Sequence, residues 1–345
     1  MEKGCYTALI TPMRADGSVD TAGLEQLLEF QIAGGVQGIL AVGTTGESPT
    51  LLWEEHNDVI ELTCARTRNR CASIAGTGSN STRETLAASE HAAHAGADAV
   101  LLVDPYYNGP SSLEIRREYV EPVARGFPQL QVIPYIIPGR TGAQMQPEDL
   151  ALLAASHANV TAVKEATGDL DNMARTRELC GPEFGIFSGD DDKTVEMMKS
   201  VRIRAAGVIS VMSNIMPAAI QRLTELLNAG DWPAADQLAA TLAPLLGIVG
   251  VTTTANTPLG PVPCKARNPL PLKTLMNILG MPAGLCRRPL GKMTQAGIRV
   301  VLDAARAVHD TDPAILAPVA DAFGVDVEAR LHDEDAIDKL TYANY

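Results

Sequence analysis

The stretch Asn159–Gly168, with the sequence NVTAVKEATG, contains a short apolar run that ends in a lysine. An apolar run of this length with β-branched residues is typical of a buried strand. Lys164 therefore stands at the C-terminal end of a predicted strand, just before a Gly-Asp pair that can begin a helix. Two interpretations are open at this point. Lys164 pairs with a carboxylate such as Glu165, or it is a Schiff-base nucleophile whose amine is kept partly neutral by apolar neighbours or a nearby cation.

Seven further apolar runs alternate with amphipathic stretches over the first 230 residues. The predicted strands lie near residues 6–10, 38–42, 72–75, 99–103, 131–136, 161–164, 185–188 and 205–209. The predicted helices lie near residues 21–33, 54–67, 82–95, 113–125, 147–156, 169–179, 191–199 and 217–228. Strands that alternate with helices pair in parallel, and eight such units predict an α/β fold of the (β/α)8 TIM barrel type. The alternative is a doubly wound sheet, but no GxGxxG motif follows the first strand.

The pattern becomes helical from Asp231, which predicts a barrel over residues 1–230 and a C-terminal helical domain over residues 231–311. Its helices are expected near residues 231–246, 271–279, 294–308 and 313–322, with a linker or surface loop at 252–268. Residues 312–345 form an acidic C-terminal extension with eight Asp and Glu against Arg330 and Lys339. We expect its end, from Leu331 onward, to be loosely docked.

The composition, with 46% hydrophobic and 20% charged residues, is that of an ordinary globular protein. A net charge of −13 argues against nucleic acids and anionic membranes as partners. No stretch predicts a leader or a membrane span, and the six cysteines form no CxxC motif, so we expect buried thiols in a reducing, cytoplasmic location. His91 and His94 share a helix face but lack a third ligand, so no metal site is predicted.

Polar residues follow several of the predicted strands, at the rim where the active sites of such barrels lie. Successive backbone N–H groups within GTTGE (residues 43–47) can form a nest for a carboxylate, and a threonine hydroxyl there can pass a proton, although a tight turn with hydroxyl capping explains the motif too. Tyr135 falls inside the fifth strand, where its hydroxyl could face Lys164 and act as acid and base. Arg140, in a Pro-Gly-Arg-Thr-Gly turn, is either a solvated charge or a bidentate carboxylate ligand.

Two further loops carry less decisive signals. Tyr106 and Tyr107 follow the fourth strand in a sequence with only 4% aromatic residues, and such tyrosines often serve packing or a subunit interface. Asp190, Asp191 and Asp192 follow the seventh strand, and a helix N-cap run is the simplest interpretation.

Together these motifs resemble the dihydrodipicolinate synthase/N-acetylneuraminate lyase family of pyruvate-dependent class I aldolases. The matching segments keep order and spacing: TALITP (7–12), GTTGES (43–48), GTGSN (76–80), PYYN (105–108), RTG (140–142), VKEA (163–166), SGDD (188–191) and GVISV (207–211). So many motifs in register over roughly residues 4 to 310 form a specific signal.

The resemblance implies that Lys164 forms an imine with pyruvate, which supplies an electron sink without a metal or cofactor. It also implies that the enamine adds to L-aspartate 4-semialdehyde to give 4-hydroxy-tetrahydrodipicolinate, for lysine and diaminopimelate biosynthesis. The resemblance assigns catalytic roles to Lys164, Tyr135, Thr44 and Tyr107, the last of which comes from a neighbouring subunit. It assigns substrate binding to Thr45, Arg140, Gly189 and Ile209. A tyrosine lent between subunits requires at least a dimer, and the family precedent is a dimer of dimers, so we expect a homo-oligomer of one of these kinds.

In regulated relatives L-lysine binds at the tight dimer interface, and this resemblance implies a possible lysine site. Its positions here are Ser48, Pro49, Trp53, His56, Asn80, Glu84 and Tyr106. Departures from the family pattern leave other functions open. Ile136 replaces an asparagine, which predicts the loss of a polar side chain near the site, and residues 199–206 replace a glycine-rich approach to Gly207. The alternatives are another aldolase or dehydratase of the family, acting on 2-keto-3-deoxy sugar acids or N-acetylneuraminate, and a non-catalytic ligand-binding barrel.

Overall fold

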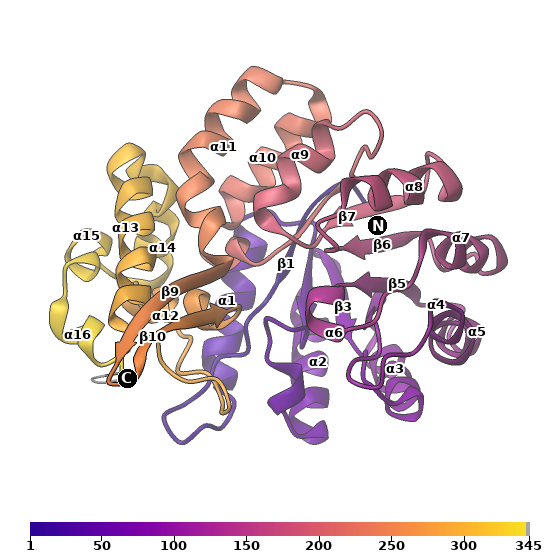
Figure 1. Cartoon of the computed structure of the whole chain (residues 1–345), viewed down its shortest axis with the longest axis horizontal. Helices are drawn as coiled ribbons and strands as arrows, with labels where there is room; N and C mark the ends of the chain where they lie inside the picture. The colour runs from indigo at the N-terminus through magenta and orange to yellow at the C-terminus, as the bar shows by residue number, and fades with distance from the viewer. Residues whose placement is uncertain (343–345) are drawn as a thin grey trace.

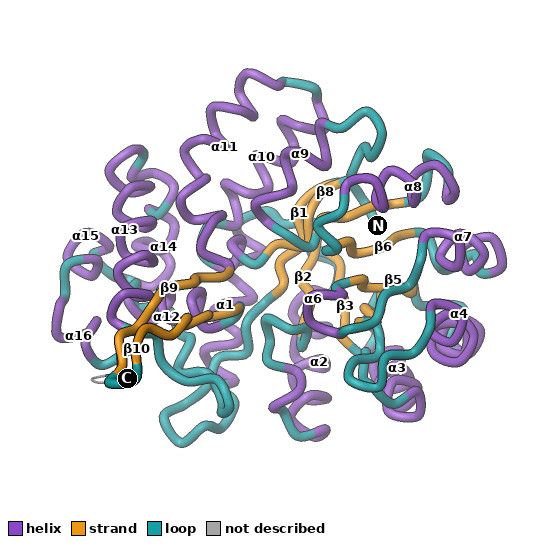
Figure 2. Tube along the Cα trace, in the orientation of Figure 1, coloured by secondary structure: helices purple, strands orange, loops and turns teal. Residues whose placement is uncertain are grey.

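Eight parallel strands close into a barrel in which each strand pairs with the next and β8 pairs with β1 (Figures 1 and 2). The computed structural model describes residues 1–342, so the last three residues of the predicted acidic extension, 343–345, lie outside the described residues. The strands are β1 (Gly4–Ala8), β2 (Gly38–Ala41), β3 (Ala72–Gly76), β4 (Ala99–Val103), β5 (Gln131–Ile136), β6 (Ala162–Glu165), β7 (Gly185–Ser188) and β8 (Gly207–Ser210). The predicted TIM barrel is confirmed.

Helices follow the strands and surround the barrel, as Figure 1 shows. Those of the barrel are α1 (Thr21–Ala33), α2 (Trp53–Thr67), α3 (Thr82–Ala95), α4 (Ser112–Glu114), α5 (Glu121–Gly126), α6 (Pro138–Thr141), α7 (Pro147–Ser156), α8 (Leu170–Cys180), α9 (Thr194–Lys199) and α10 (Pro217–Ala229). A π-helical turn over Ile115–Val120 joins α4 to α5 within the single helix that the sequence predicts. The short helix α6, which carries Arg140, was predicted only as a turn.

Each strand is buried on both faces, which explains why the sequence shows continuous apolar runs rather than alternation. One set of side chains fills the barrel interior, where Tyr6 meets the edge of Phe187 with ring centroids 5.5 Å apart. The other set packs against the surrounding helices. Ile136 belongs to this outer core and is 1% exposed, whereas Tyr135 faces the interior. The expectation that Ile136 removes a polar group from the site is therefore wrong, because its side chain points away from the interior.

The C-terminal region begins with α11 (Trp232–Leu246) and continues with two strands that the sequence did not predict. Residues 252–268, expected to be a linker or surface loop, lie mostly in an antiparallel hairpin of β9 (Gly250–Thr257) and β10 (Gly260–Arg267). The prediction failed because Pro261 and Pro263 suppress the strand signal. In a two-stranded sheet every strand is an edge, so a residue without an N–H group is tolerated.

The remaining helices are α12 (Leu270–Ile278), α13 (Gln295–Thr311), α14 (Ala317–Phe323), α15 (Val327–Leu331) and α16 (Glu334–Asp338). The expected loose docking from Leu331 onward is wrong for the described residues. Leu331 is fully buried and Ile337 is 4% exposed, while Thr341 forms a β-bridge with Met293. The Arg330 guanidinium donates to the Ile278 carbonyl at 2.8 Å, which ties the segment to α12.

All six cysteines are free thiols, but the expectation that they are buried holds only for Cys5 and Cys64. Within residues 1–342, no helix combines the length and the apolar character that a membrane crossing requires.

Candidate active site

A cavity of about 250 Å³ opens where β2, β3, β4 and β5 end. It brings together residues from the motifs that the sequence singled out. They include Thr44, Ser48, Tyr106, Tyr135 and Arg140. The carboxyl ends of the strands therefore form the rim on which the sequence placed the chemistry.

Lys164 is buried in the barrel interior with 4% of its surface exposed. It stands opposite Tyr135 in the β5–β6 register, and its Nζ lies 4.4 Å from the centroid of the tyrosine ring. Burial lowers the pKa of Lys164 to about 8, although the carboxylates of Asp191 and Asp190 act in the opposite direction. An amine with this pKa has a usable neutral fraction near pH 7, which is what a nucleophile needs.

The alternative interpretation, an ion pair between Lys164 and Glu165, does not fit the geometry. Successive strand side chains point to opposite faces, and Glu165 accepts hydrogen bonds from the backbone N–H of Thr167 at 2.7 Å and from Asn172 Nδ2 at 3.4 Å. No ion pair joins Lys164 to a carboxylate in the part of the chain whose side chains the structure describes. Gly189 keeps space for the lysine, because a Cβ there would lie 3.2 Å from Lys164 Cε.

Tyr135 is buried beside Lys164 with 4% of its surface exposed, and Thr44 lines the same cavity. Burial raises the pKa of Tyr135, while the charge of Arg140 and the nearby Thr44 side chain act to lower it. A protonated phenol with a hydroxyl neighbour can both give and accept a proton during a reaction at the lysine. Ile209, from β8, lies in the same barrel interior and is fully buried.

The loop after β2 presents backbone donors to the cavity. Within the described chain, the N–H groups of Thr44 and Thr45 donate no hydrogen bond to protein atoms, whereas the N–H of Glu47 and of Ser48 bond back to carbonyls of the same loop. Val42 enters the loop with φ at +47° and Glu47 leaves it at +57°, values that are uncommon for residues other than glycine. The strained turn holds two free amides together, and such a nest binds carboxylates.

Arg140 lies on α6, and its Nη2 donates to the Asn268 carbonyl at 3.1 Å. Asn268 also donates from Nδ2 to the Thr45 hydroxyl at 2.9 Å. A residue from the C-terminal region therefore connects the two loops that carry the candidate carboxylate ligands. Reasoning from local sequence patterns missed Asn268, because nothing near it in the chain indicates that it folds back over the barrel.

Asp191 was also missed, since the N-cap interpretation of the Asp190–Asp192 run is wrong for it. It is 3% exposed and makes hydrogen bonds with the Ser210 hydroxyl and the Val211 backbone N–H. Burial raises its pKa to about 6, and its charge raises the pKa of Lys164. Asp190 occupies the cap position but makes no side-chain cap bond. These carboxyls set the electrostatics of the lysine rather than the start of a helix.

Tyr107 is the one predicted catalytic residue that the rest of the chain does not hold in the site. It is 91% exposed, so its side chain has few contacts with the rest of the chain, and its φ of +79° is a strained conformation for a residue other than glycine. Leu52, Trp53 and Leu113 are also exposed apolar residues.

Two of the candidate lysine-binding positions, Glu84 and Tyr106, lie close to each other. Burial raises the pKa of Tyr106, and the charge of Glu84 raises it by a smaller amount. Glu84 also accepts a hydrogen bond from the Ser79 hydroxyl at 2.6 Å.

His56, another of these positions, is 2% exposed, and one of its ring nitrogens lies 3.1 Å from the Gly76 carbonyl. Burial lowers its pKa to about 4, so the imidazole is neutral near pH 7. It packs edge-on against Trp53 with ring centroids 5.1 Å apart. Asn80 is exposed, and Ser48 lines the active-site cavity.

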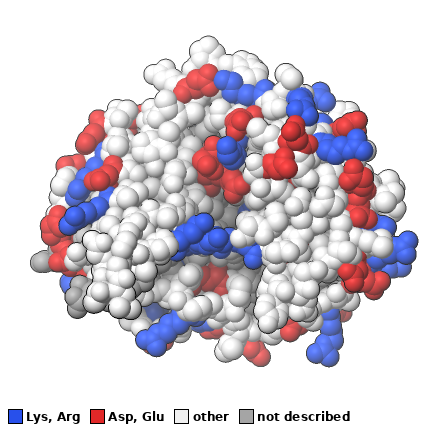
Figure 3. Space-filling view, in the orientation of Figure 1, with Lys and Arg blue, Asp and Glu red and all other residues white. Residues whose placement is uncertain are grey.

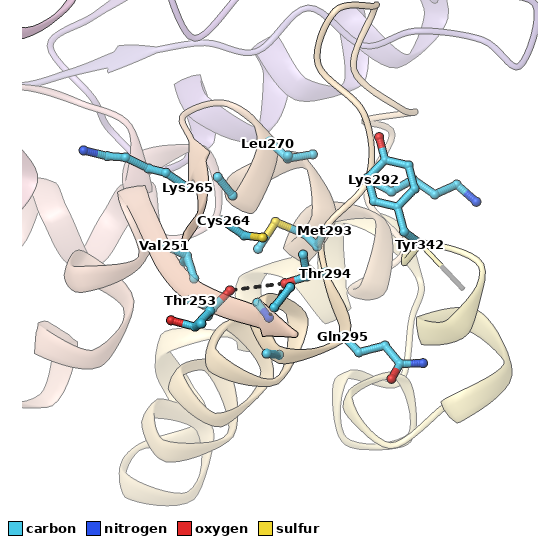
Figure 4. A pocket seen from close by; sticks show the side chains of 15 residues that line it. Val251, Thr253, Cys264, Lys265, Leu270, Lys292, Met293, Thr294, Gln295 and Tyr342 are labelled. Carbon is cyan, nitrogen blue, oxygen red and sulfur yellow. Dashed lines mark hydrogen bonds between the residues drawn. The ribbon is translucent and has the colours of Figure 1, made fainter. Parts of the chain in front are cut away.

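A second cavity of about 540 Å³ lies between the β9–β10 hairpin and the start of α13 (Figure 4). It is lined by small, apolar and hydroxyl side chains together with Lys265, Lys292 and Gln295. Thr253 and Thr294 are in hydrogen-bond contact at 3.3 Å. None of the candidate catalytic residues lines it.

A buried lysine of lowered pKa, beside a tyrosine and a carboxylate-binding turn at the mouth of a (β/α)8 barrel, is the arrangement of a lyase that works through a Schiff base. Residues 1–307 match the model of the dihydrodipicolinate synthetase family. The chain belongs to this family and is a lyase.

Curated relatives support the assignment across most of the chain. The 4-hydroxy-tetrahydrodipicolinate synthase of Geotalea daltonii is 40% identical over 296 residues, which are 86% of this chain and 95% of the relative. That of Methanococcus vannielii is 38% identical over 294 residues, 85% and 94% of the two chains. The solved structure of the synthase from Methylacidiphilum fumariolicum SolV has a TM-score of 0.82 at 34% identity and covers 94% of this chain and all of its own. A lysine-bound structure from Cyanidioschyzon merolae has a TM-score of 0.80 at 33% identity, covering 89% and 98%.

Proposed function

We propose that the chain condenses pyruvate with L-aspartate 4-semialdehyde to give 4-hydroxy-tetrahydrodipicolinate, a step of lysine and diaminopimelate biosynthesis. The observation that carries the proposal is the buried Lys164 amine, with a pKa of about 8, against the Tyr135 ring. The family membership and the names of the relatives agree with this activity.

The reaction begins when the neutral Lys164 amine adds to the pyruvate ketone and water leaves, which forms an imine. Loss of a methyl proton gives an enamine, whose carbon attacks the aldehyde of the second substrate. The α-amino group of that substrate then attacks the imine carbon and displaces Lys164, which closes the ring. The imine is the electron sink, so the protein needs to supply only proton transfer and positioning.

The side chains divide these tasks by position. The free amides of Thr44 and Thr45 hold the pyruvate carboxylate, while Gly189 and Ile209 shape the space around the imine. Tyr135 and Thr44 carry protons to and from the reacting atoms, and Tyr107 of a second copy completes the relay. Arg140 holds the carboxylate of the aldehyde substrate by charge-assisted hydrogen bonds.

Borohydride reduction in the presence of pyruvate, followed by peptide mass spectrometry, tests the first step. We expect the reduced pyruvyl adduct on the peptide that contains Lys164 and on no other peptide, and no adduct on a Lys164→Met variant. The same adduct on the Lys164→Met protein would rule out Lys164 as the nucleophile. Turnover of aspartate semialdehyde, compared with 2-keto-3-deoxy sugar acids and N-acetylneuraminate, then tests the second substrate.

The exposed Tyr107 supports a homo-oligomer in which each site borrows this residue from its neighbour. A mixture of Tyr107→Phe and Lys164→Met proteins tests the exchange. Mixed dimers in which one site holds both intact residues should regain activity that neither parent has. Absence of any regained activity in mixtures shown to contain mixed dimers would contradict the exchange.

We further propose that L-lysine binds beside Tyr106 and Glu84, where Ser48, Trp53, His56 and Asn80 also lie in the family pattern. The neutral, buried His56 supports the site as a packing residue against Trp53 rather than as a charged ligand. Inhibition by L-lysine that is lost in Glu84→Gln, with unchanged activity in its absence, tests the site. Full activity at millimolar L-lysine would rule out the proposed lysine site.

The division into a barrel over residues 1–230, a C-terminal domain over 231–311 and an extension over 312–345 remains our proposal for the domain organisation. A cytoplasmic location likewise remains a proposal, supported by the six free thiols.

A further inference from the structure

Arg267 ends β10, at the foot of the hairpin, and its side chain reaches the active-site rim. Arg267 Nη1 donates to the Gly139 carbonyl at 3.1 Å, while Arg140 Nη2 donates to the Asn268 carbonyl at 3.1 Å. The side chain of each arginine thus contacts the backbone next to the other. This reciprocal pair of contacts brings Arg267 close enough to Arg140 for its charge to act on it, beside the cavity that Arg140 lines.

The two arginines have no anionic partner within the described chain. Among the residues whose side chains the structure describes, no carboxylate forms an ion pair within 4.0 Å with either guanidinium, although Asp and Glu number 41 against 28 Lys and Arg. Each guanidinium instead donates a hydrogen bond to a neutral backbone carbonyl. Burial is the main cause of a lowered Arg140 pKa, and the charge of Arg267 lowers it further, while Tyr135 and Asp190 act to raise it. Two neighbouring positive charges that form no ion pair with a carboxylate favour the binding of an anion.

One further lysine lies on the same face of the hairpin as Arg267. Lys265 stands two residues before Arg267 on the exposed face of β10, and it also lines the second cavity (Figure 4). In Figure 3 Lys and Arg side chains gather at the centre of the face, where the hairpin approaches α6 in Figure 1. Across the site, Asp190 lies close enough to Arg140 and Lys164 for their charges to lower its pKa, against the larger effect of burial.

We propose that Arg267 is a second ligand for the carboxylate of the aldehyde substrate, and that it forms a two-guanidinium clamp with Arg140. This inference rests on the proposed function, because it concerns the second substrate of that reaction. One guanidinium can hold a carboxylate through two parallel hydrogen bonds, and a second one adds charge and fixes the direction of approach. The pyruvate carboxylate, on the amides of Thr44 and Thr45, is bound elsewhere.

The placement also suits a strongly acidic protein whose two substrates are anions. A net charge of −13 repels these anionic substrates at long range. The basic cluster of Arg140 and Arg267 offsets this repulsion at the entrance to the active-site cavity. Binding through Arg267 should therefore weaken as salt increases.

Steady-state kinetics of Arg267→Gln test the clamp. We expect KM for aspartate semialdehyde to rise about fivefold to tenfold, the effect of losing one partly solvated charge-assisted contact, with kcat and KM for pyruvate within about twofold of the wild type. Arg267→Lys should recover part of the loss, and the dependence of kcat/KM on ionic strength should weaken in Arg267→Gln. The control is Arg68→Gln, which removes one exposed arginine between α2 and β3, at the opposite end of the barrel, and should leave all these values unchanged.

A substrate change separates carboxylate binding from mere support of α6. Replacing the α-carboxylate of the aldehyde substrate by the neutral amide should raise KM less in Arg267→Gln than in the wild-type enzyme, because the contact between Arg267 and the carboxylate is already absent in the variant. An equal KM for aspartate semialdehyde in Arg267→Gln and wild type, or an equal amide penalty in both, would overturn this inference alone. A wild-type enzyme that forms the pyruvyl imine but does not consume aspartate semialdehyde would overturn the proposed function and this inference with it.

Discussion

The titration of Lys164 is the property on which the chemistry depends most directly. A lowering of the pKa from 10.5 to about 8 raises the neutral fraction at pH 7 from about 0.03% to about 9%, a gain of about 300-fold in nucleophile. Burial causes the lowering, and the charges of Asp191 and Asp190 limit it. Asp190→Asn removes one of these negative charges without removing a cap hydrogen bond, because its side chain makes none. We therefore expect the pKa of Lys164 to fall below 8 in this variant.

Competitive acetylation measures this pKa directly. Trace acetic anhydride is added to the apoenzyme between pH 6 and 11, and the labelled Lys164 peptide is quantified by mass spectrometry against a free amine in the same solution. The wild-type curve should have its midpoint near pH 8, and that of Asp190→Asn should lie at lower pH. Asp192→Asn is the matched control, because the exposed Asp192 is not among the charges that act on Lys164.

A wild-type midpoint near 10.5 would refute the argument that burial prepares the amine. A midpoint that stays at pH 8 in Asp190→Asn, or that moves equally in Asp192→Asn, would show instead that the local carboxylate does not tune it.

Three further changes follow from the geometry. Because the pKa of Lys164 is lower in the folded state, the unfolded state binds more protons between about pH 8 and 10.5, and the free energy of unfolding rises with pH in that window. Below pH 8 the folded state carries the full free-energy cost of a buried charged lysine. Lys164→Met should therefore raise the free energy of unfolding at pH 7 by up to about 3 kcal/mol, as measured by urea titration. Lys273 and Glu47 form a buried ion pair at 2.7 Å, with each side chain 1% exposed. Lys273→Met should therefore lower the free energy of unfolding by about 3–5 kcal/mol, and the double variant with Glu47→Gln should recover part of it. Arg140→Gln should raise KM for aspartate semialdehyde by about 10- to 100-fold while borohydride trapping of pyruvate persists, since the arginine contacts only the second substrate.

Most of the barrel could be predicted from the sequence because its strands are buried on both faces. Such strands must be short and apolar, and eight of them recur with helices between. The β9–β10 hairpin was not predicted because its strands are half exposed and contain prolines. A period of two was nevertheless present, since Val262, Cys264 and Ala266 alternate with the more exposed Pro263 and Lys265. The alternation would have predicted a strand if it had been given more weight than the prolines.

The site shows the same division between local and distant information. Lys164 and Tyr135 lie on strands whose direction and register follow from the fold, so their meeting could be predicted. The roles of Asp191 and Asn268 could not, because each depends on where a chain segment returns after leaving the barrel. Asp191 reads as a helix cap until the burial of its side chain against β8 is known.

The C-terminal region therefore does more than extend the barrel. Asn268 bonds to Thr45 and Lys273 to Glu47, so the middle and the C-terminal end of the strained loop after β2 are fixed by residues more than 200 positions later. The backbone N–H of Arg287 donates to the second oxygen of Glu47 at 2.7 Å, which completes the set of partners for that buried carboxylate. A positive φ at Glu47 is unfavourable on its own and persists because these contacts determine it. The amides at Thr44 and Thr45 consequently remain in place for an anion, because the C-terminal region holds the loop that presents them.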